Sequence, residues 1–334
     1  MIDLNSKLVD SFGRVAKKLR ISVTDRCNMR CIYCMPTNNT DWFEQESILT
    51  FDEIIRVVTI LADLGVDRIR LTGGEPLVRP NISILIKGLS KVAGIKAISM
   101  TTNGLGLQSA ASDLTNAGLG SVNVSLDTLR NNRFKAINGV YGLENVLRGI
   151  QAAEDVGLHV KINTVMIRGW NDDEVVEFAE FARRTNYTVR FIEFMPLDGT
   201  SLWGSHLVVG KAEIIQKLAS EGIEIVPLFN DNSEPARLFT FVDKRGTIGF
   251  IPSITEPFCI NCDRIRLTSD GKLLTCLYER PGKDLKELLR DGKSNNEIER
   301  HILESIKNKP EGIIGLIRGK SLRPTMNLMY KIGG

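Results

Sequence analysis

A chain of 334 residues with 43% hydrophobic and 25% charged residues can build one large or two smaller folded units, and its composition is that of an ordinary globular protein. The net charge of +3, from 43 basic and 40 acidic side chains, excludes a charge-based case for nucleic acid or a membrane surface as the partner. No apolar signal segment opens the chain, and no apolar run reaches the roughly 18 residues of a membrane span. We therefore expect a cytoplasmic protein, in which six cysteines indicate metal ligands or catalytic groups rather than disulfides.

Strand-like and helical segments alternate between Lys18 and Met195. Thr50-Phe-Asp-Glu53 predicts a capping box at the start of a helix that Gly65 ends, and a second helical pattern runs from Leu143 to Gly157. Alternation of this kind predicts right-handed βαβ units around a parallel sheet. The runs predicted to be strands are rich in β-branched residues and are Leu19–Thr24, Val66–Leu71, Ala97–Thr101, Ser121–Leu126, His159–Val165 and Val189–Met195.

Polar and apolar residues alternate along these predicted strands. Arg20 and Ser22 alternate with Leu19 and Ile21, and the next four strands repeat the pattern, whereas the sixth fits it poorly. An eight-stranded barrel fills its interior with branched apolar side chains. Six strands with one polar face therefore predict an α/β fold in which an incomplete (β/α)6 TIM-like barrel encloses a substrate-sized cavity.

The sequence changes character after Met195. One amphipathic segment, Ile214–Leu218, is followed by short strand-like runs at Glu224–Leu228, Leu238–Phe241 and Thr247–Ile251. We interpret this part as a C-terminal module that contains three of the six cysteines and ends in Gly333-Gly334. The predicted division is a barrel domain over residues 1–220 and the module over residues 221–334.

Three cysteines, Cys27, Cys31 and Cys34, lie within eight residues directly after the first predicted strand. A structural zinc site uses four ligands, usually in two separated pairs, so this group is too compact for one. Three thiolates on a [4Fe–4S] cluster leave one iron open to a substrate or cofactor. The spacing therefore indicates such a cluster, with a zinc knuckle or a set of redox thiols as the alternative.

The spacing Cys-x3-Cys-x2-Cys, with Tyr33 before the last cysteine, resembles the radical S-adenosylmethionine (SAM) superfamily. Thr72-Gly-Gly-Glu75-Pro76 supports this resemblance, because it follows the second strand, where the superfamily's glycine-rich segment meets the amino group of SAM. Glycines permit close approach of the backbone, and Glu75 offers a carboxylate. By itself such a motif is most often only a turn, and it is the combination with the cysteines that is specific.

The second cysteine group consists of Cys259, Cys262 and Cys276. No histidine lies near it in the sequence. A second iron–sulfur cluster and a structural zinc with a distant fourth ligand both remain open on the spacing alone.

The segment Cys259-x2-Cys262-Asp-Arg264-Ile-Arg266, followed by Cys276, resembles the GTP 3′,8-cyclase family, which catalyses the first step of molybdenum cofactor biosynthesis. The resemblance covers essentially the whole chain, and no departure is seen at the quoted motifs. The other matching motifs are Arg20–Cys27, Arg70–Pro76, Thr101–Gly104, Asn123–Asp127, Lys161–Asn163, Arg190–Pro196 and Gly333-Gly334.

This resemblance implies a role for each matched residue. Cys27, Cys31 and Cys34 would hold the cluster that binds SAM, and Cys259, Cys262 and Cys276 an auxiliary [4Fe–4S] cluster that faces the guanine. SAM would contact Tyr33, Gly74, Ser125 and Met195. GTP would contact Arg20, Arg70, Thr101, Lys161, Arg264 and Arg266, and the catalytic group would be Arg264, Arg266, Gly333 and Gly334. The alternation described above independently places Arg20, Arg70, Thr101, Ser125 and Lys161 on the polar face.

The reaction that the resemblance implies starts with a 5′-deoxyadenosyl radical, which removes the hydrogen from C3′ of GTP. The carbon radical then attacks C8, and the product is 3′,8-cyclo-7,8-dihydro-GTP. An external electron donor is required, a downstream enzyme of the same pathway is a possible partner, and the chain would be a monomer or a homodimer. Glu193 and Asp127 stand in matched motifs without an assigned role.

Two other functions fit part of the pattern. A radical SAM enzyme that modifies a peptide would need a cavity open to a chain, usually more C-terminal cysteines, and fewer basic residues on the inner face. A non-catalytic iron–sulfur redox sensor would have no need of Gly73-Gly74-Glu75-Pro76 or of Ser125. Neither would form a product from GTP.

Overall fold

The computed structural model describes residues 8–35, 41–197, 202–229, 234–279, 282–319 and 328–333. Six parallel strands form its centre and correspond to the six predicted strands. They are β1 (Lys18–Ser22), β2 (Arg68–Thr72), β3 (Ala97–Thr102), β4 (Ser121–Ser125), β5 (His159–Met166) and β6 (Thr188–Glu193). The helices that connect them are α1 (Phe51–Asp63), α2 (Ile82–Leu89), α3 (Leu107–Asn116), α4 (Asn131–Asn138), α5 (Leu143–Asp155) and α6 (Val175–Thr185).

The predicted capping box is present at α1. Thr50 accepts a hydrogen bond from the backbone of Glu53, whose side chain accepts one from the backbone of Thr50. Leu64 is the C-cap, and Gly65 follows with φ +108°, a conformation that favours glycine. The second predicted helix, which begins at Leu143, is α5.

The C-terminal part of the chain extends the same sheet at both edges. Over the described residues the strand order is β12-β11-β10-β1-β2-β3-β4-β5-β6-β9-β8-β7. β10 is parallel to β1 and β9 is parallel to β6, whereas the outer strands are antiparallel. The added strands are β7 (Ile225–Pro227), β8 (Arg237–Phe241), β9 (Thr247–Ile251), β10 (Arg264–Leu267), β11 (Lys272–Leu274) and β12 (Lys283–Asp284).

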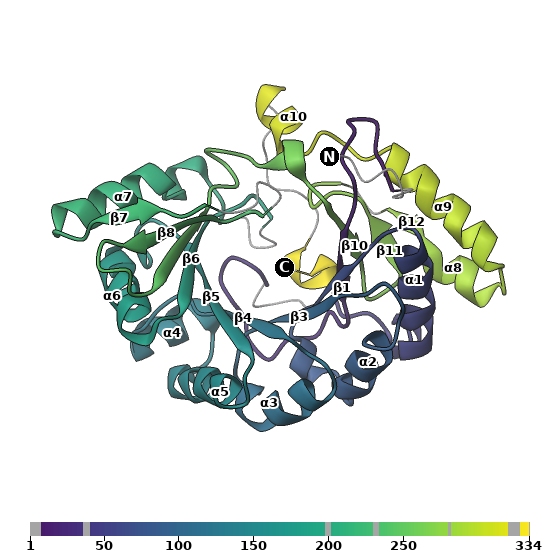
Figure 1. The fold of residues 1–334 in the computed structure, drawn as a ribbon, viewed down its shortest axis with the longest axis horizontal. Helices are drawn as coiled ribbons and strands as arrows, with labels where there is room; N and C mark the ends of the chain where they lie inside the picture. The colour runs from purple at the N-terminus through teal and green to yellow at the C-terminus, as the bar shows by residue number, and fades with distance from the viewer. Residues whose placement is uncertain are drawn as a thin grey trace.

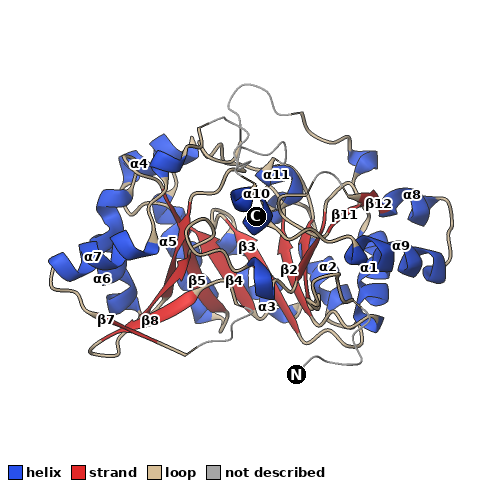
Figure 2. Ribbon diagram, turned by 90° about the horizontal axis from the view of Figure 1, so that it is seen from above, coloured by secondary structure: helices blue, strands red, loops and turns tan. Residues whose placement is uncertain are grey.

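The sheet curves into an open ring with most helices on its outer side (Figure 1). Figure 2 shows the strands in the interior, with α6 and α7 on one flank and α1, α8 and α9 on the other. The short helix α11 lies inside the ring (Figure 1). The helices of the C-terminal part are α7 (Lys211–Ser220), α8 (Leu285–Arg290), α9 (Asn295–Lys307), α10 (Ile313–Arg318) and α11 (Met329–Ile332). Among the described residues no helix has the length and apolar character that crossing a bilayer requires.

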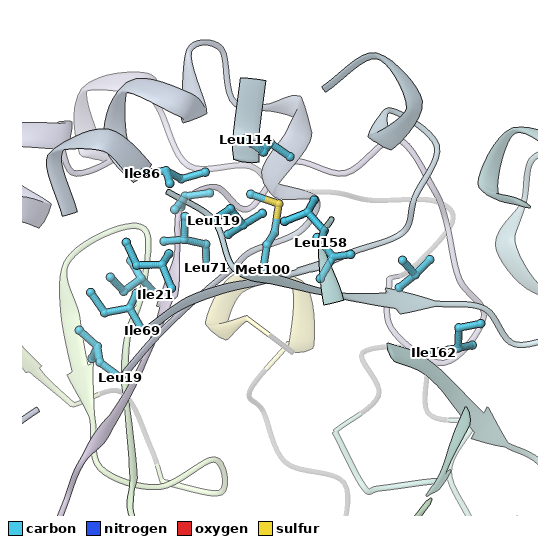
Figure 3. Close-up of a cluster of buried hydrophobic side chains, with 14 of the residues drawn as sticks. Leu19, Ile21, Ile69, Leu71, Ile86, Met100, Leu114, Leu119, Leu158 and Ile162 are labelled. Atoms are coloured by element: carbon cyan, nitrogen blue, oxygen red, sulfur yellow. The ribbon is translucent and has the colours of Figure 1, made fainter. Parts of the chain in front are cut away.

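The hydrophobic core lies between the strands and the outer helices. Leu19 and Ile21 of β1 and Leu71 of β2 are fully buried there and pack with side chains of α2 and α3 such as Ile86 and Leu114 (Figure 3). Because side chains alternate across a strand, the polar residues of the same strands must face the inside of the ring. This arrangement confirms the predicted incomplete barrel with a polar inner face.

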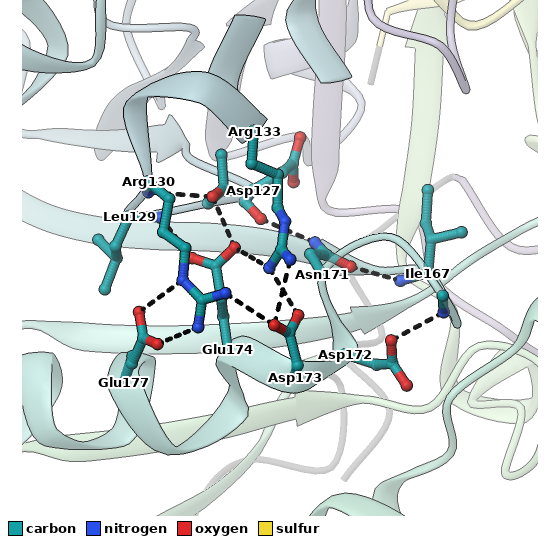
Figure 4. Close-up of polar contacts among 12 residues, drawn as sticks. Asp127, Leu129, Arg130, Arg133, Ile167, Asn171, Asp172, Asp173, Glu174 and Glu177 are labelled. Atoms are coloured by element: carbon teal, nitrogen blue, oxygen red, sulfur yellow. Dashed lines mark hydrogen bonds and ion pairs between the residues drawn. The ribbon is translucent and has the colours of Figure 1, made fainter. Parts of the chain in front are cut away.

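A buried polar network fixes the loop that follows β4 (Figure 4). The Glu174 carboxylate is fully buried and accepts hydrogen bonds from Thr128 Oγ1 (2.6 Å) and the Leu129 backbone (2.7 Å). It also pairs with Arg133 at 2.6 Å. Asn171 donates to the carbonyl of Asp127 at 2.7 Å. These contacts tie the loop that carries Asp127 to the segment before α6.

We predict that Glu174→Ala lowers the free energy of unfolding by about 3 kcal/mol, because Arg133 loses its buried partner and two donors lose their acceptor. Glu177→Ala is the matched control, since its pair with Arg130 is exposed and contributes less than about 1 kcal/mol. Urea unfolding of the metal-free chain measures both variants. Equal losses in the two variants would contradict the structural role given to Glu174.

Candidate active site

The first cysteine group lies at the rim formed by the carboxyl ends of the parallel strands. Cys27, Cys31 and Cys34 follow β1, and the other residues predicted to bind SAM follow or end β2, β4 and β6. Parallel strands bring these ends to one edge of the sheet. Residues from all of these segments line a single cavity, among them Tyr33, Gly74, Ser125 and Met195. The structure therefore brings the predicted SAM residues together beside the three cysteines.

Gly74 is required by the packing of this rim. Its backbone donates to the carbonyl of Thr24 at 2.7 Å, so the glycine loop lies directly against the cysteine loop. A Cβ atom at Gly74 would stand 2.3 Å from the carbonyl oxygen of Arg26 and 2.5 Å from that of Asp25. Both obstacles are backbone atoms, so only glycine fits.

Glu75 joins the loops after β2 and β3. Its buried carboxylate accepts hydrogen bonds from Thr102 Oγ1 (2.7 Å) and from the backbones of Asn103 (2.6 Å) and Leu77 (3.0 Å). Burial raises the pKa of Glu75 to about 7 despite these donors. The contacts within the chain thus give this carboxylate a structural role at the cavity wall.

The two acidic residues without an assigned role are both buried and hydrogen-bonded. Asp127 accepts from the Tyr33 hydroxyl at 2.7 Å and from the Val165 backbone at 2.8 Å, and burial raises the pKa of Asp127 to about 6. Glu193 accepts from the backbones of Ile254 (2.8 Å) and Thr255 (2.9 Å). Asp127 therefore positions a side chain of the first cysteine loop, and Glu193 fixes the segment that leads to the second.

The second cysteine group lies toward the opposite end of the barrel. Cys259 and Cys262 precede β10, which is parallel to β1, so they lie at the amino-terminal end of these strands. Cys276 follows β11, whose antiparallel pairing with β10 returns the chain to that end. All six cysteines are free thiols, and all six line the same cavity. Among the described residues, no three Cys, His, Asp or Glu side chains are grouped as ligands of a single metal ion.

The thiols of the two groups differ in their electrostatic surroundings. Burial raises the pKa of Cys27 and Cys31, and raises that of Cys34 to about 12. Burial acts in the same direction on Cys262, but the charges of Arg264 and Lys309 outweigh it and bring the pKa of Cys262 to about 7. These charges therefore favour the thiolate form of Cys262, which is the form that binds metals.

Buried guanidinium groups occupy the cavity between the two cysteine groups. Burial and the neighbouring charges of Arg266 and Arg70 hold the pKa of Arg20 well below its usual range. Burial likewise lowers the pKa of Arg266 to about 10, with help from Arg264, and that of Arg190 to about 9, with help from Arg70. So many mutually repelling cations in one buried space indicate a site for a strongly anionic ligand.

Two of these cations, Arg190 and Arg70, donate hydrogen bonds to neutral groups. Arg190 donates to Asn163 Oδ1 (2.9 Å) and Asn123 Oδ1 (2.6 Å), and Arg70 donates to Ser99 Oγ at 3.2 Å. Glu234, whose charge acts on Arg70, is paired with Lys18 at 2.7 Å. The positive charge of the cavity is therefore available to a ligand.

The structure places most, but not all, of the predicted GTP residues on this cavity. Arg20, Arg70, Thr101, Arg264 and Arg266 line it. Lys161 instead lines a separate depression at the amino-terminal ends of β3 to β6. Burial lowers the pKa of Lys161, and the charges of Arg190 and Arg70 lower it further.

Sequence reasoning did not assign a role to Arg190, which lines the cavity and is 6% exposed. It pairs in register with Asn163 of β5. The available signal was a single arginine within the otherwise apolar run Val189–Ile192, on the one predicted strand that fitted the alternation poorly.

The C-terminal helix α11 covers the first cysteine loop from inside the ring. The Tyr330 backbone hydrogen-bonds to the Cys34 sulfur. The rings of Tyr330 and Trp42 pack edge to face, with 5.8 Å between their centroids. Gly333 caps the helix with φ +79°, and its carbonyl accepts a hydrogen bond from Arg266. A Cβ atom on Gly333 would stand 2.5 Å from Thr72 Cγ2. Gly334, also predicted to be in the catalytic group, lies outside the described residues.

An open α/β barrel with three thiols after its first strand and a glycine loop after its second defines a radical SAM protein. Residues 21–182 match the radical SAM superfamily, and residues 187–314 match the family described as molybdenum cofactor synthesis C. The solved structure of Streptococcus suis SuiB bound to S-adenosylmethionine is similar in fold, with a TM-score of 0.58 and 16% identity over 85% of this chain and 68% of that one. This likeness concerns the fold alone.

The chain belongs to the GTP 3′,8-cyclase family. It is 43% identical to the GTP 3′,8-cyclase of Thermodesulfovibrio yellowstonii over 97% of this chain and 99% of the relative. It is 45% identical to that of Pelotomaculum thermopropionicum over 90% and 94% of the two chains.

We predict that Gly74→Ala displaces the first cysteine loop, because a new Cβ would collide with two backbone carbonyls. If the cost of overpacking, about 1–3 kcal/mol, falls on the SAM-bound state, SAM binding is weaker by about fivefold or more. Gly106→Ala is the control, since its Cβ would meet only side-chain atoms, at 3.6 Å or more. Iron per chain and the SAM dissociation constant are measured for both. Unchanged SAM binding in Gly74→Ala would show that the rim accommodates a side chain.

Proposed function

We propose that this chain is a GTP 3′,8-cyclase, which converts GTP to 3′,8-cyclo-7,8-dihydro-GTP in the first step of molybdenum cofactor biosynthesis. One observation carries the proposal: a buried belt of guanidinium groups lies between two groups of three cysteines in a single cavity. A nucleoside triphosphate has the charge that this belt requires. Membership of the family supports the same activity.

The residues at the rim fit the cofactors of a radical SAM enzyme. Cys27, Cys31 and Cys34 supply three sulfur ligands for a [4Fe–4S] cluster and leave one iron for the cofactor. Tyr33, Gly74, Ser125 and Met195 stand around the same space and would bind SAM. When bound and reduced, these groups supply the 5′-deoxyadenosyl radical that takes the hydrogen from C3′ of GTP.

The second cysteine group fits an auxiliary [4Fe–4S] cluster that faces the guanine. Cys259, Cys262 and Cys276 line the substrate cavity, and Cys262 lies beside the cations Arg264 and Lys309, which favour its thiolate. Three ligands again leave one iron of such a cluster open. A cluster here would therefore hold the base while the arginines hold the phosphates.

The role of the chain itself is to hold and orient the nucleotide. Arg20, Arg70, Thr101, Arg264 and Arg266 would bind GTP, and we add Arg190 to this set. We keep Lys161 in the proposal, because the charges of Arg190 and Arg70 act on it although it lines the adjoining depression. Guanidinium groups match the geometry of phosphate oxygens, and in a buried site their attraction is weakly screened. Fixing the ribose between base and triphosphate brings C3′ close to C8, which lowers the entropic part of the barrier to ring closure.

The C-terminal tail would complete the catalytic group. Gly333 already contacts Arg266 and lies against Thr72, so the tail helps to exclude water from the space between the two cysteine groups. We assign Arg264, Arg266, Gly333 and Gly334 to the positioning of the substrate near the reacting carbons. Exclusion of water also protects a radical intermediate from side reactions.

The two alternative functions explain less of the cavity. A peptide substrate would not require five arginines in the cavity lining, and α11 lies inside the ring. A redox sensor would not require the glycine loop that packs against the first cysteine group. An external electron donor, a downstream enzyme of the pathway and a monomeric or dimeric state remain part of the proposal.

The reaction is tested with GTP deuterated at C3′, incubated anaerobically with the reconstituted protein, SAM and a strong reductant. We expect deuterium in the 5′-deoxyadenosine together with a cyclised nucleotide, both detected by mass spectrometry. The chain with Cys259, Cys262 and Cys276 replaced by alanine controls for cleavage of SAM without substrate. If 5′-deoxyadenosine forms without deuterium and GTP is not consumed, the GTP assignment fails and a peptide substrate becomes the leading alternative.

We predict that Arg190→Gln raises the KM for GTP by about tenfold or more, because it removes a charged hydrogen-bond donor worth about 1.5–3 kcal/mol from the cavity. The SAM dissociation constant should not change, since Arg190 lies between the two cysteine groups and not at the rim. Arg168→Gln is the control, because Arg168 pairs with Glu213 at the surface. A KM for GTP equal to that of the control would remove Arg190 from the substrate site.

A further inference from the structure

Lys309 is a buried lysine next to the second cysteine group. It lies two residues after the end of α9 and is 3% exposed. Its Nζ donates hydrogen bonds to the backbone carbonyls of Cys262 and Arg264, both at 3.0 Å. The ammonium group therefore bridges the last residues before β10 and the first residue of that strand.

The charge of Lys309 has no acidic partner among the described residues, since both of its hydrogen-bond acceptors are neutral carbonyls. Removal of an ammonium group from water is strongly unfavourable unless negative charge compensates it. Two carbonyl dipoles compensate only in part. The side chains on which this charge acts are the thiols of Cys262 and Cys276.

Arg14 provides a comparison within the same region. Its guanidinium donates to the carbonyl of Cys259 at 3.1 Å and to that of Pro310 at 2.6 Å. Arg14 thus also holds the cysteine segment, but its charge is neutralised by Asp10 at 2.6 Å. Of these two cations, only Lys309 leaves its charge to the cysteine group.

We propose that Lys309 is a positioning residue of the second cysteine group, which holds the Cys262–Arg264 backbone and adds to the positive charge of Arg264 that balances an anionic iron–sulfur centre bound there. This inference rests on the auxiliary cluster of the proposed function and adds to it a residue that is not a ligand. Lys309 contacts this loop through the backbone carbonyls of Cys262 and Arg264.

Two measurable consequences follow from this position. Loss of the side chain frees the backbone of the Cys262 loop, so the centre should be lost more readily. Loss of the charge makes the reduced, more negative state of the centre less stable, so its reduction potential should fall. A purely structural lysine would affect the first property and leave the second unchanged.

The experiment uses the full chain with Cys27, Cys31 and Cys34 replaced by alanine, so that only the second group can hold a cluster. After anaerobic reconstitution we expect about four iron atoms per chain in this parent. Iron content and the midpoint potential, followed by electron paramagnetic resonance, are then measured for Lys309→Met, Lys309→Gln and Lys309→Arg. Lys307→Met is the matched control, because Lys307 is exposed at the end of the same helix.

We expect Lys309→Met to lose iron and to show a lower midpoint potential in the fraction that remains. Lys309→Gln, whose amide can still donate to carbonyls, should keep more iron but show the same fall in potential. Lys309→Arg should restore both properties. Circular dichroism of the metal-free variants shows whether each is folded. If Lys309→Met does not fold, Lys309→Gln still tests the role of the charge.

Two results would overturn the proposal, and they are distinguishable. If the parent holds a cluster, and Lys309→Met and Lys309→Gln match Lys307→Met in iron content and potential, the role of Lys309 is refuted while the proposed function stands. If the parent binds no iron, the auxiliary cluster of the proposed function fails, and the inference fails with it.

Discussion

The parallel pairing of β10 with β1 is the contact on which the site depends. It aligns Lys18 with Arg264 and Arg20 with Arg266, so arginines from opposite ends of the sequence share one cavity. It also sets the direction of both strands, with Cys27 beyond the carboxyl end of β1 and Cys262 before the amino end of β10. The two cysteine groups are therefore separated by about the length of the strands, and a substrate can lie between them.

The cavity formed in this way is electrostatically unfavourable without a ligand. Burial lowers the pKa of both Arg20 and Arg190, and the charge of Arg70 lowers both further. Arg190 and Arg70 are hydrogen-bonded to neutral groups. A triphosphate would replace this repulsion by attraction in a space with little water. The hydrophobic core in Figure 3 supplies free energy of folding that offsets the repulsion among these cations.

Buried carboxylates play a different part, because they organise the loops around the cavity. Glu75 joins the loops after β2 and β3, Glu193 holds the segment before Cys259, and Glu174 fixes the loop after β4. Asp127 holds Tyr33 of the first cysteine loop. Each accepts hydrogen bonds from neighbouring backbone or side-chain groups, which is how a buried carboxylate is stabilised. The acidic residues of the site are thus engaged with the protein, whereas the arginines Arg70, Arg190 and Arg266 have only neutral hydrogen-bond acceptors among the described residues.

The sequence by itself determined the incomplete barrel, the two groups of cysteines and most of the cationic residues. These features depend on local patterns, namely the alternation of Arg20 and Ser22 with Leu19 and Ile21 and the spacing of Cys27, Cys31 and Cys34. Only the tertiary structure decided that the strands of the C-terminal part extend both edges of one sheet, that Arg190 enters the cavity and that Lys161 lies outside its lining. The tertiary structure also decided the position of Gly333 beside Arg266 and the burial of Lys309. The physical reason is that strand pairing and burial depend on contacts between residues far apart in the chain, which no local spacing encodes.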